Sequence, residues 1–307
     1  MKISIIGAGN VGSLTAMRIA EEGLAGVVLV DIVKGLAQGK AFDLEDARAA
    51  LKYNYNISPA DDLGQIRGSD IIVITAGVSR KPGMLREELL NKNAQILKEI
   101  SLQIKKLAQE AVVIIVTNPL DLMTYLALEI TGSRRERVFG MGVSLDSARF
   151  ANLIAKKLNL PFADIDACVV GSHGEGMLPL SRFTKIKDKG LDEVLDEKER
   201  GSLIESTKNR GQEIVSLLAS SSAYFAPSAC ILNIIKCIVK DEKKAIGISA
   251  YLDGEYGLKD VCIGVPCRLG SKGIEEIIEL PLNKEEFDKF LLSAESLKKQ
   301  IKSLPFN

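Results

Sequence analysis

The sequence predicts an α/β protein in which a doubly wound parallel sheet is followed by an α+β domain. Three observations favour this fold class. Short apolar runs alternate with segments of helical periodicity in the first half of the chain. A glycine-rich turn joins the first apolar run to the first helical segment. Near the end of the chain, apolar runs at 261–268 and 274–280 flank a Gly-Ser-Lys-Gly turn, which is typical of an antiparallel hairpin.

Composition limits the classes of protein to which the chain can belong. Forty Lys and Arg residues balance forty Asp and Glu residues, so no net field attracts nucleic acid or an anionic membrane. No apolar run approaches the length of a membrane-spanning helix, and the apolar start stops at Gly7, too early for a signal peptide. Five cysteines without a C-x-x-C pair predict buried, reduced thiols, and we expect a cytoplasmic location.

The glycine-rich turn carries a dinucleotide-binding motif, made of Gly7, Ala8, Gly9, Asn10, Val11 and Gly12. Its first glycine permits a tight turn, its second lets the backbone approach a pyrophosphate, and its third lets the helix pack on the strand. A second strand, at 27–30, ends in Asp31, whose carboxylate can accept hydrogen bonds from ribose hydroxyls and would repel a 2′-phosphate. Together these features predict a Rossmann domain that binds NAD; the alternative is a βαβ unit without a ligand.

Small residues follow the next strand, at 71–75, and again suit the close approach of a ligand: Thr75, Ala76 and Gly77. The segment 78–86 then contains a Pro-Gly pair and three cations, Arg80, Lys81 and Arg86, and precedes a long helix at 87–108. This loop is either a solvated basic loop or a mobile one whose arginines close over an anionic substrate.

A continuous apolar run at 111–117 predicts a central parallel strand that is buried on both faces. Asn118 and Pro119 follow it, so Asn118 is either the N-cap of a helix with Pro119 at its first position, or a functional side chain. A short strand at 137–139 completes a pattern of six parallel strands.

The sequence contains one histidine, His173, in the glycine-rich stretch that follows an apolar strand at 165–170. Histidine exchanges a proton near neutral pH, so His173 is either an acid/base catalyst or a loop histidine without a role. A helix at 144–158 brings Asp146 and Arg149 onto one face. They form either a surface ion pair or a pair in which Asp146 orients a histidine and Arg149 binds a carboxylate.

Three further elements complete the expected fold. A long helix runs from residue 197 to 240 with a break near Ala226-Pro227, and a strand follows at 245–251. Asn283 and Glu286 form a capping box at the start of the final helix. Because 307 residues exceed the usual size of one domain, we expect a cofactor-binding domain at 1–143 and a substrate-binding, catalytic α+β domain at 144–307.

On these residues the chain resembles the lactate/malate dehydrogenase superfamily and, within it, the lactate-dehydrogenase-like malate dehydrogenases. The resemblance covers essentially the whole length and rests on seven motifs in order: 7–12, Asp31, 75–77, 80–84 with Arg86, 116–119, 145–150 and 171–174. It implies NAD as the cofactor, a dicarboxylate substrate, no metal ion, and a homodimer or homotetramer.

The resemblance also implies a role for each matching residue. His173 is the acid/base catalyst, Asp146 orients it, and Arg149 binds the substrate carboxylate next to the reacting carbon. Arg86 polarises the substrate carbonyl, and Asn118 contacts the same oxygen and the nicotinamide side. Cofactor contacts extend to a few more positions: Asn93, Val116 and the residues of the first three motifs.

Arg80 decides the substrate within this family. Its position typically holds glutamine in lactate dehydrogenases and arginine in malate dehydrogenases. A second carboxylate needs a counterion, whereas the methyl group of pyruvate would leave a buried guanidinium unpaired. The resemblance therefore implies malate. The alternatives are a lactate or broad 2-hydroxyacid dehydrogenase, a redox-sensing NAD-binding protein without turnover, and a metal- and NAD-dependent glycosidase, which would need further metal ligands.

Overall fold

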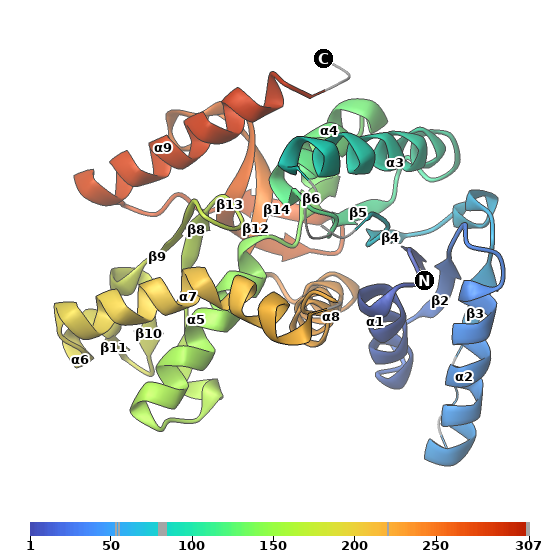
Figure 1. Ribbon diagram of the computed structural model, residues 1–307, viewed down its shortest axis with the longest axis horizontal. Coiled ribbons are helices and arrows are strands. Elements are labelled where there is room, and N and C mark those ends of the chain that lie inside the picture. The colour runs from blue at the N-terminus through green and yellow to red at the C-terminus, as the bar shows by residue number, and fades with distance from the viewer. Residues whose placement is uncertain (53, 55, 79–84, 220, 305–307) are drawn as a thin grey trace.

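The computed structural model describes residues 1–52, 54, 56–78, 85–219 and 221–304. In this part of the chain one sheet of eleven strands runs through the molecule, with helices on both faces (Figure 1). Its strand order is β3-β2-β1-β4-β5-β6-β12-β13-β8-β9, and β14 pairs with β13. A second sheet has the order β11-β10-β7.

The first half of the large sheet is parallel and confirms the six expected strands. They are β1 (Lys2–Ile6), β2 (Gly26–Val30), β3 (Ile57–Ala60), β4 (Ile71–Ile74), β5 (Val112–Ile115) and β6 (Val138–Gly140). The strand β3 is the one that the apolar pattern does not locate. It has four residues, includes Pro59, and buries Ile57 alone, which is typical of an edge strand.

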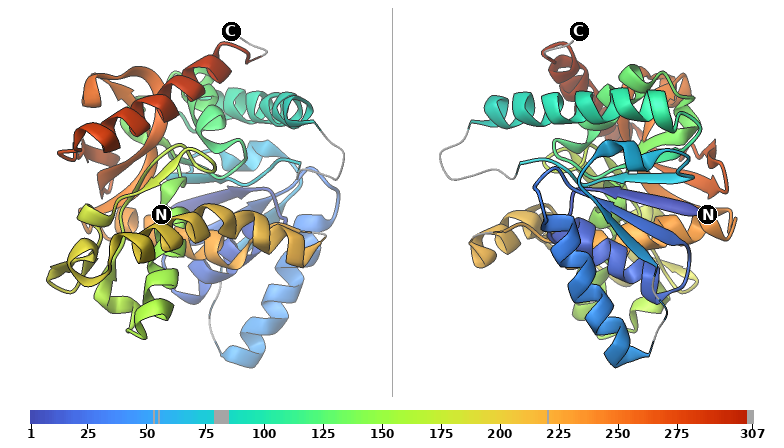
Figure 2. Two further views of the ribbon diagram at one scale, coloured as in Figure 1. Left: turned by 60° about the vertical axis from the view of Figure 1, so that its left-hand side comes forward. Right: turned by 90° about the vertical axis from the view of Figure 1, so that its right-hand side faces the viewer.

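Helices cover the parallel half on both sides, as a doubly wound sheet requires. The helices α1 (Asn10–Glu21) and α2 (Leu36–Leu51) lie on one face, and α3 (Arg86–Leu107) and α4 (Leu120–Thr131) lie on the other (Figure 2). The connections therefore change face between β1 and β4, which are neighbours in the sheet. The carboxyl ends of these two strands form the crevice where a dinucleotide binds in this type of sheet.

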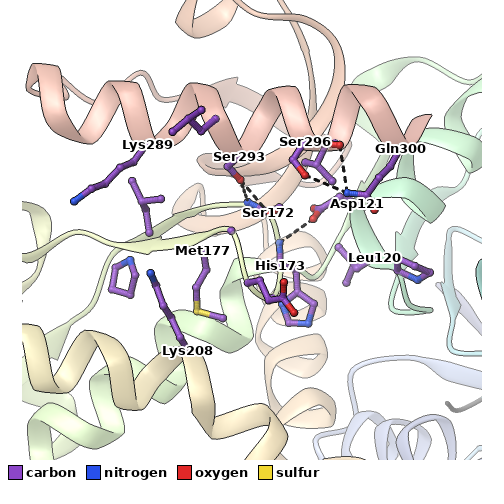
Figure 3. Close-up of a pocket in the computed structure, with 18 of the residues that line it drawn as sticks. Leu120, Asp121, Ser172, His173, Met177, Lys208, Lys289, Ser293, Ser296 and Gln300 are labelled. Carbon is purple, nitrogen blue, oxygen red and sulfur yellow. Dashed lines mark hydrogen bonds between the residues drawn. The ribbon is translucent and has the colours of Figure 1, made fainter. Parts of the chain in front are cut away.

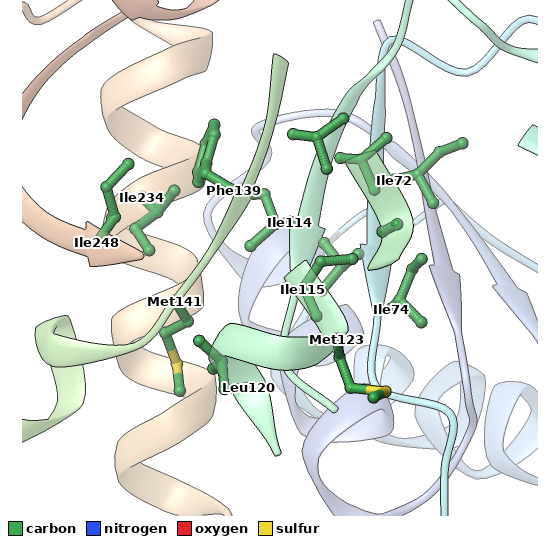
Figure 4. Close-up of a cluster of buried hydrophobic side chains, with 14 of the residues drawn as sticks. Ile72, Ile74, Ile114, Ile115, Leu120, Met123, Phe139, Met141, Ile234 and Ile248 are labelled. Atoms are coloured by element: carbon green, nitrogen blue, oxygen red, sulfur yellow. The ribbon is translucent and has the colours of Figure 1, made fainter. Parts of the chain in front are cut away.

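Four or five apolar residues in succession make the central strands suitable for burial on both faces. Every residue of β4 and β5 is buried, and Figure 4 shows Ile72, Ile74, Ile114 and Ile115 packed with Met123 of α4 nearby. The same apolar cluster continues into the second half of the chain. Phe139 of β6 lies in it together with Ile234 of α8 and Ile248 of β12. The sheet and its core are therefore continuous across residue 143. The domain boundary expected there stays a prediction.

The second half of the sheet is antiparallel. The strand β12 (Lys244–Asp253) pairs with β6, where Ser249 lies opposite Gly140, and with β13 (Lys259–Gly270). The expected hairpin is confirmed as β13 and β14 (Gly273–Ile277). On its other side β13 pairs with β8 (Val169–Gly171), where Gly264 lies opposite Gly171, and β9 (Met177–Pro179) pairs with β8. A Cβ atom on Gly264 would lie 2.5 Å from the carbonyl oxygen of Gly171, so glycine is required there.

The remaining elements surround this antiparallel half. Its helices are α5 (Val143–Leu158), α6 (Leu191–Val194), α7 (Glu197–Leu218), α8 (Phe225–Val239) and α9 (Lys284–Ile301). Its short strands are β7 (Ile165–Asp166), β10 (Lys185–Ile186) and β11 (Lys189–Gly190). The chain also contains short 3₁₀ helices: η1 (Leu63–Ile66), η2 (Arg135–Arg137), η3 (Phe162–Asp164), η4 (Ser181–Phe183) and η5 (Glu255–Gly257).

Two expectations for this half were wrong in detail. The helix predicted to break near Ala226-Pro227 ends instead at Leu218, and α8 begins at Phe225. Pro227 therefore lies in the first turn of α8, where a missing N–H costs no helical hydrogen bond. The strand expected at 165–170 is divided into β7 and β8, which belong to different sheets. The capping box at α9 is confirmed: Asn283 Oδ1 accepts the Glu286 N–H at 2.9 Å, and Glu286 accepts the Asn283 N–H at 2.8 Å.

The cysteines are unpaired thiols, as expected. Cys230, Cys237, Cys262 and Cys267 are buried, whereas Cys168 is half-buried. Burial raises the pKa of the Cys230 thiol to about 11 and that of Cys168 to about 12, so neither is a reactive thiolate near neutral pH. Within the described ranges, no helix is both long enough and apolar enough to cross a membrane.

Candidate active site

The glycine-rich motif forms the turn between β1 and α1, and its glycines are required for different reasons. Gly7 has φ +108°, and a Cβ atom there would lie 2.6 Å from the backbone nitrogen of Ala76. A Cβ atom on Gly12 would overlap the carbonyl oxygen of Gly7. Gly9 differs, because a Cβ atom there would meet no protein atom within 4 Å. Gly9 is also the N-cap of α1 and makes no side-chain cap, so the helix N-terminus is open to an anion.

Asp31 fixes the same turn at the end of β2. Its Oδ2 accepts the Ala8 N–H at 2.7 Å, and its Oδ1 accepts the Val33 N–H at 2.9 Å. Each carboxylate oxygen can accept more than one hydrogen bond, and Asp31 is only half-buried. The open space at Gly9 and the carboxylate at Asp31 therefore fit the pyrophosphate and the adenosine ribose of NAD.

The ends of β4 and β5 continue this surface. Thr75 Oγ1 donates to the carbonyl oxygen of Gly7 at 3.0 Å, and Thr117 Oγ1 donates to that of Ala76 at 2.6 Å. A Cβ atom on Gly77 would lie 2.7 Å from the Thr117 methyl carbon, so Gly77 allows the two strand ends to approach closely. Val116 is half-buried at the end of β5.

Asn93 of α3 is buried and connects the segments that follow β4 and β5. Its Oδ1 accepts the Val78 N–H at 2.8 Å, and its Nδ2 donates to the carbonyl oxygen of Asn118 at 2.7 Å. Asn118 itself is exposed. The interpretation of Asn118 as a helix cap is wrong, because Pro119 is the N-cap of α4 and no side chain caps it.

The second group of candidate residues lies at the loop between β8 and β9. His173 Nδ1 lies 2.7 Å from Oδ2 of Asp146, whose side chain on α5 is 0% exposed. The imidazole itself is 14% exposed. Because the carboxylate accepts a hydrogen bond from Nδ1, the neutral imidazole carries its lone pair on Nε2. The loop geometry thus gives a histidine with a fixed tautomer.

Arg149 shares the same carboxylate. Its Nη1 lies 3.2 Å from Asp146 Oδ1, and the guanidinium is 13% exposed. Its Nε is buried and has no hydrogen-bond partner within the described part of the chain. Gly211 of α7 faces this guanidinium, since a Cβ atom there would lie 3.3 Å from Nη1. Asp146 and Arg149 are therefore a buried pair with unused donors, rather than a surface ion pair.

Opposing effects set the pKa of His173. Burial of the imidazole lowers it, but the charge of Asp146 and its hydrogen bond raise it, with a smaller contribution from Asp121 in the same direction. Arg149 lowers it. The net result is a pKa above the ordinary value of 6.5. The proton on this imidazole is therefore available near neutral pH.

A cavity of about 1390 Å³ adjoins His173 and Asn118. Its walls come from the start of α4, the β8–β9 loop, α7 and α9, as Figure 3 shows for Leu120, Met177 and Lys208. The residues of the glycine-rich turn do not line it. Of the candidate residues, His173 and Asn118 line this cavity, whereas Asp146 and Arg149 lie behind His173 and are not part of its lining.

Two predicted substrate-binding arginines have side chains outside the described part of the chain. Arg80 lies outside the described residues, and the side chain of Arg86, the first residue of α3, is not described either. Among the described residues, no cluster of three or more His, Cys, Asp or Glu side chains could hold a metal ion.

Asp121, Ser249 and Ser293 form hydrogen bonds around the loop that carries His173, and no sequence motif predicted them. Asp121 Oδ2 accepts the backbone N–H of His173 at 2.8 Å, and Asp121 Oδ1 accepts the Ser249 hydroxyl at 2.6 Å. Ser293 Oγ accepts the backbone N–H of Ser172 at 2.9 Å. One sequence signal pointed to Asp121: a carboxylate within the apolar start of α4 is expected to be buried, and a buried charge needs partners.

A strand–turn–helix that fits a dinucleotide, next to a cavity with a carboxylate-oriented histidine, defines a nicotinamide-dependent dehydrogenase. Two family models agree with this class. The lactate/malate dehydrogenase NAD binding domain matches residues 1–140, and the lactate/malate dehydrogenase alpha/beta C-terminal domain matches residues 143–305. The chain belongs to the lactate/malate dehydrogenase family, whose members are NAD-dependent oxidoreductases.

Individual relatives are similar over their full length. The malate dehydrogenase of Methanosarcina mazei is 45% identical over 304 residues, which cover 99% of each chain. The structure of the malate dehydrogenase from Aeropyrum pernix has a TM-score of 0.95 at 39% identity and covers 99% of this chain and 98% of its own. The structure of the lactate dehydrogenase from Cryptosporidium parvum, complexed with lactic acid and NAD, has a TM-score of 0.95 at 32% identity. It covers 100% of this chain and 98% of its own.

Two glycine variants test the cofactor crevice. Gly9→Ala should lower the melting temperature only slightly, because its methyl group meets no protein atom and only the N-cap preference for glycine is lost. It should weaken NADH binding about 10-fold by occupying space needed by the pyrophosphate. Gly12→Ala is the matched comparison and should destabilise the fold by about 1–3 kcal/mol. NADH fluorescence titration and thermal unfolding measure the two effects. Unchanged NADH affinity in Gly9→Ala would place the pyrophosphate elsewhere.

Proposed function

We propose that this chain catalyses reversible hydride transfer between (S)-malate and NAD⁺, giving oxaloacetate and NADH. The observation that supports this most is the buried carboxylate of Asp146, which bonds the catalytic candidate His173 with one oxygen and Arg149 with the other. This arrangement supports His173 as the proton donor and Arg149 as the group that binds a substrate carboxylate, because one rigid carboxylate holds both side chains. The similarity to relatives named malate dehydrogenase supports the choice of substrate.

The residues of the chain divide the work of the reaction. When bound, NADH supplies the hydride. Arg149 binds the carboxylate next to the reacting carbon through donors that Asp146 leaves free. His173, protonated at Nε2, gives its proton to the oxygen of the substrate carbonyl, and in the reverse direction it accepts that proton from the hydroxyl of malate. Asp146 fixes the ring and stabilises the imidazolium.

Three further roles in the reaction are assigned to Asn118, Arg86 and Arg80. Asn118 contacts the reacting oxygen, and Arg86 polarises the same carbonyl in a closed, water-poor site. Arg80 binds the second carboxylate of the dicarboxylate. The support for Arg80 and Arg86 is their place in the sequence motif, which contains both arginines six residues apart.

Lactate dehydrogenase is the second candidate, since a lactate dehydrogenase shares the fold at a TM-score of 0.95. The catalytic group of histidine, aspartate and arginine suits both reactions. Arg80 distinguishes them, because a guanidinium without a distal carboxylate would be left unpaired in the closed site.

We also propose that the protein acts in the cytoplasm as a homo-oligomer, without nucleic acid or membrane partners. Its unpaired thiols suit a reducing compartment. Large apolar side chains at the end of α7 and the start of α8 are exposed, including Leu217 at 79% and Phe225 at 64%, and suit contact with a second copy.

Removal of the imidazole tests the acid/base role. His173→Asn should leave NADH affinity nearly unchanged and lower kcat by about 10²- to 10⁴-fold, because proton transfer to the substrate oxygen is lost. Stopped-flow kinetics with oxaloacetate and NADH fluorescence titration measure the two quantities. Turnover close to that of the unmodified protein would exclude His173 as the catalyst.

A change at Arg80 tests the substrate. Arg80→Gln should lower kcat/KM for oxaloacetate and raise it for pyruvate, shifting their ratio by about 100-fold or more, because a charged contact is removed from one substrate only. NADH absorbance with each substrate in turn gives the ratio. A constant ratio would mean that another residue binds the distal carboxylate.

The pH dependence follows from the raised pKa of His173. Oxaloacetate reduction needs the imidazolium, so kcat/KM should be constant at low pH and fall as the pH rises through a value above 6.5. Malate oxidation needs the neutral ring, so its kcat/KM should rise through the same value. Profiles in both directions check this, and a reduction limb centred below pH 6.5 would contradict it.

A further inference from the structure

Asp121 is a buried carboxylate whose hydrogen bonds lead to the catalytic loop. Asp121 is 4% exposed and lies on the face of α4 that is turned toward β12 and the β8–β9 loop. One oxygen accepts the backbone N–H of His173 at 2.8 Å (Figure 3). The other oxygen accepts the Ser249 hydroxyl at 2.6 Å. Asp121 lies three residues after Asn118, so it joins the segment at the cofactor crevice to the segment that carries the acid/base group.

A neutral side chain could accept the same hydrogen bonds, so the charge itself needs an explanation. Burial raises the pKa of Asp121 to about 6, while the bond from Ser249 and the proximity of His173 lower it. The carboxylate is therefore ionised above about pH 6, next to a histidine that alternates between its neutral and positive forms in the proposed reaction. A buried negative charge is costly unless a positive charge compensates it.

Among the described residues, the charges that shift the pKa of His173 most come from two helices. Asp146 and Arg149 face His173 from α5, and Asp121 faces it from α4. On the side of α9, the loop meets the neutral hydroxyl of Ser293, which accepts the backbone N–H of Ser172 at 2.9 Å. The two sides of the loop are thus held by equivalent hydrogen bonds, one to a charged group and one to a neutral group.

We propose that Asp121 is a second positioning residue for the reaction: its carboxylate holds the main chain of His173, and its negative charge stabilises the imidazolium of the same residue. Asp146 acts on the ring from Nδ1, whereas Asp121 acts on the backbone and through space. The inference rests on the proposed function in one respect, since it is the imidazolium that donates the proton to the substrate.

The single histidine of the sequence allows a direct test. In untagged protein labelled with ¹³C at histidine Cε1, every imidazole signal belongs to His173, and its chemical shift against pH gives its pKa without turnover. Asp121→Asn removes the charge and keeps the hydrogen bonds, because the amide oxygen can accept the His173 N–H while the amide nitrogen donates to Ser249. Ser293→Ala is the control, since it removes a hydrogen bond to the same loop without changing charge.

We expect the His173 pKa to be lower in Asp121→Asn and unchanged in Ser293→Ala. The alkaline limb of oxaloacetate reduction should move to lower pH in the first variant alone, with kcat/KM lowered about 10-fold at neutral pH. An unchanged His173 pKa in Asp121→Asn would overturn the proposal and leave Asp121 as a structural anchor.

Two further arrangements keep the test decisive. If Asp121→Asn does not fold, Ser249→Ala replaces it. Loss of the hydroxyl that donates to Asp121 disfavours the ionised carboxylate, so the His173 pKa should again fall. An unchanged His173 pKa in Ser249→Ala would overturn the proposal. If the unmodified protein does not turn over malate, the proposed function fails, while the NMR titration still reports whether Asp121 stabilises the imidazolium.

Discussion

The candidate site depends on the point where the parallel and antiparallel halves of the sheet join. There Ser249 of β12 lies opposite Gly140 of β6. A Cβ atom on Gly140 would lie 2.5 Å from Leu120 Cδ2, so the absence of a side chain lets the start of α4 lie against the join. The Ser249 hydroxyl then reaches Asp121 in the same helix at 2.6 Å. One strand pairing therefore brings the residues after Asn118 beside the loop that carries His173.

Much of the fold could be predicted because its strands and helices have strong local patterns. Central strands such as β4 and β5 are apolar throughout, and the capping box of α9 is a local signal within four residues. Weak or competing signals caused the errors. The strand β3 has one buried residue, and Pro227 marks the first turn of a helix as readily as the end of one.

The candidate site was only partly predictable, because its contacts connect distant segments. Spacing placed Asp146 and Arg149 on one face of α5, but the approach of Asp146 to His173, 27 residues away, follows from no local pattern. Asp121 was missed for the same reason: its partner Ser249 is 128 residues away, and no local pattern specifies that pairing. The side chains of Arg80 and Arg86 are not described, so their roles stay predictions from the motif.

The shared carboxylate of Asp146 has a consequence for substrate binding under the proposed function. Asp146 raises the pKa of His173, whereas Arg149 lowers it. A substrate carboxylate on Arg149 would neutralise the charge that opposes protonation, so the balance at His173 would move toward the imidazolium. Arg149 would then do more than hold the substrate. Its pairing with oxaloacetate would favour the protonation state that reduction needs, because both residues are bound to one buried group.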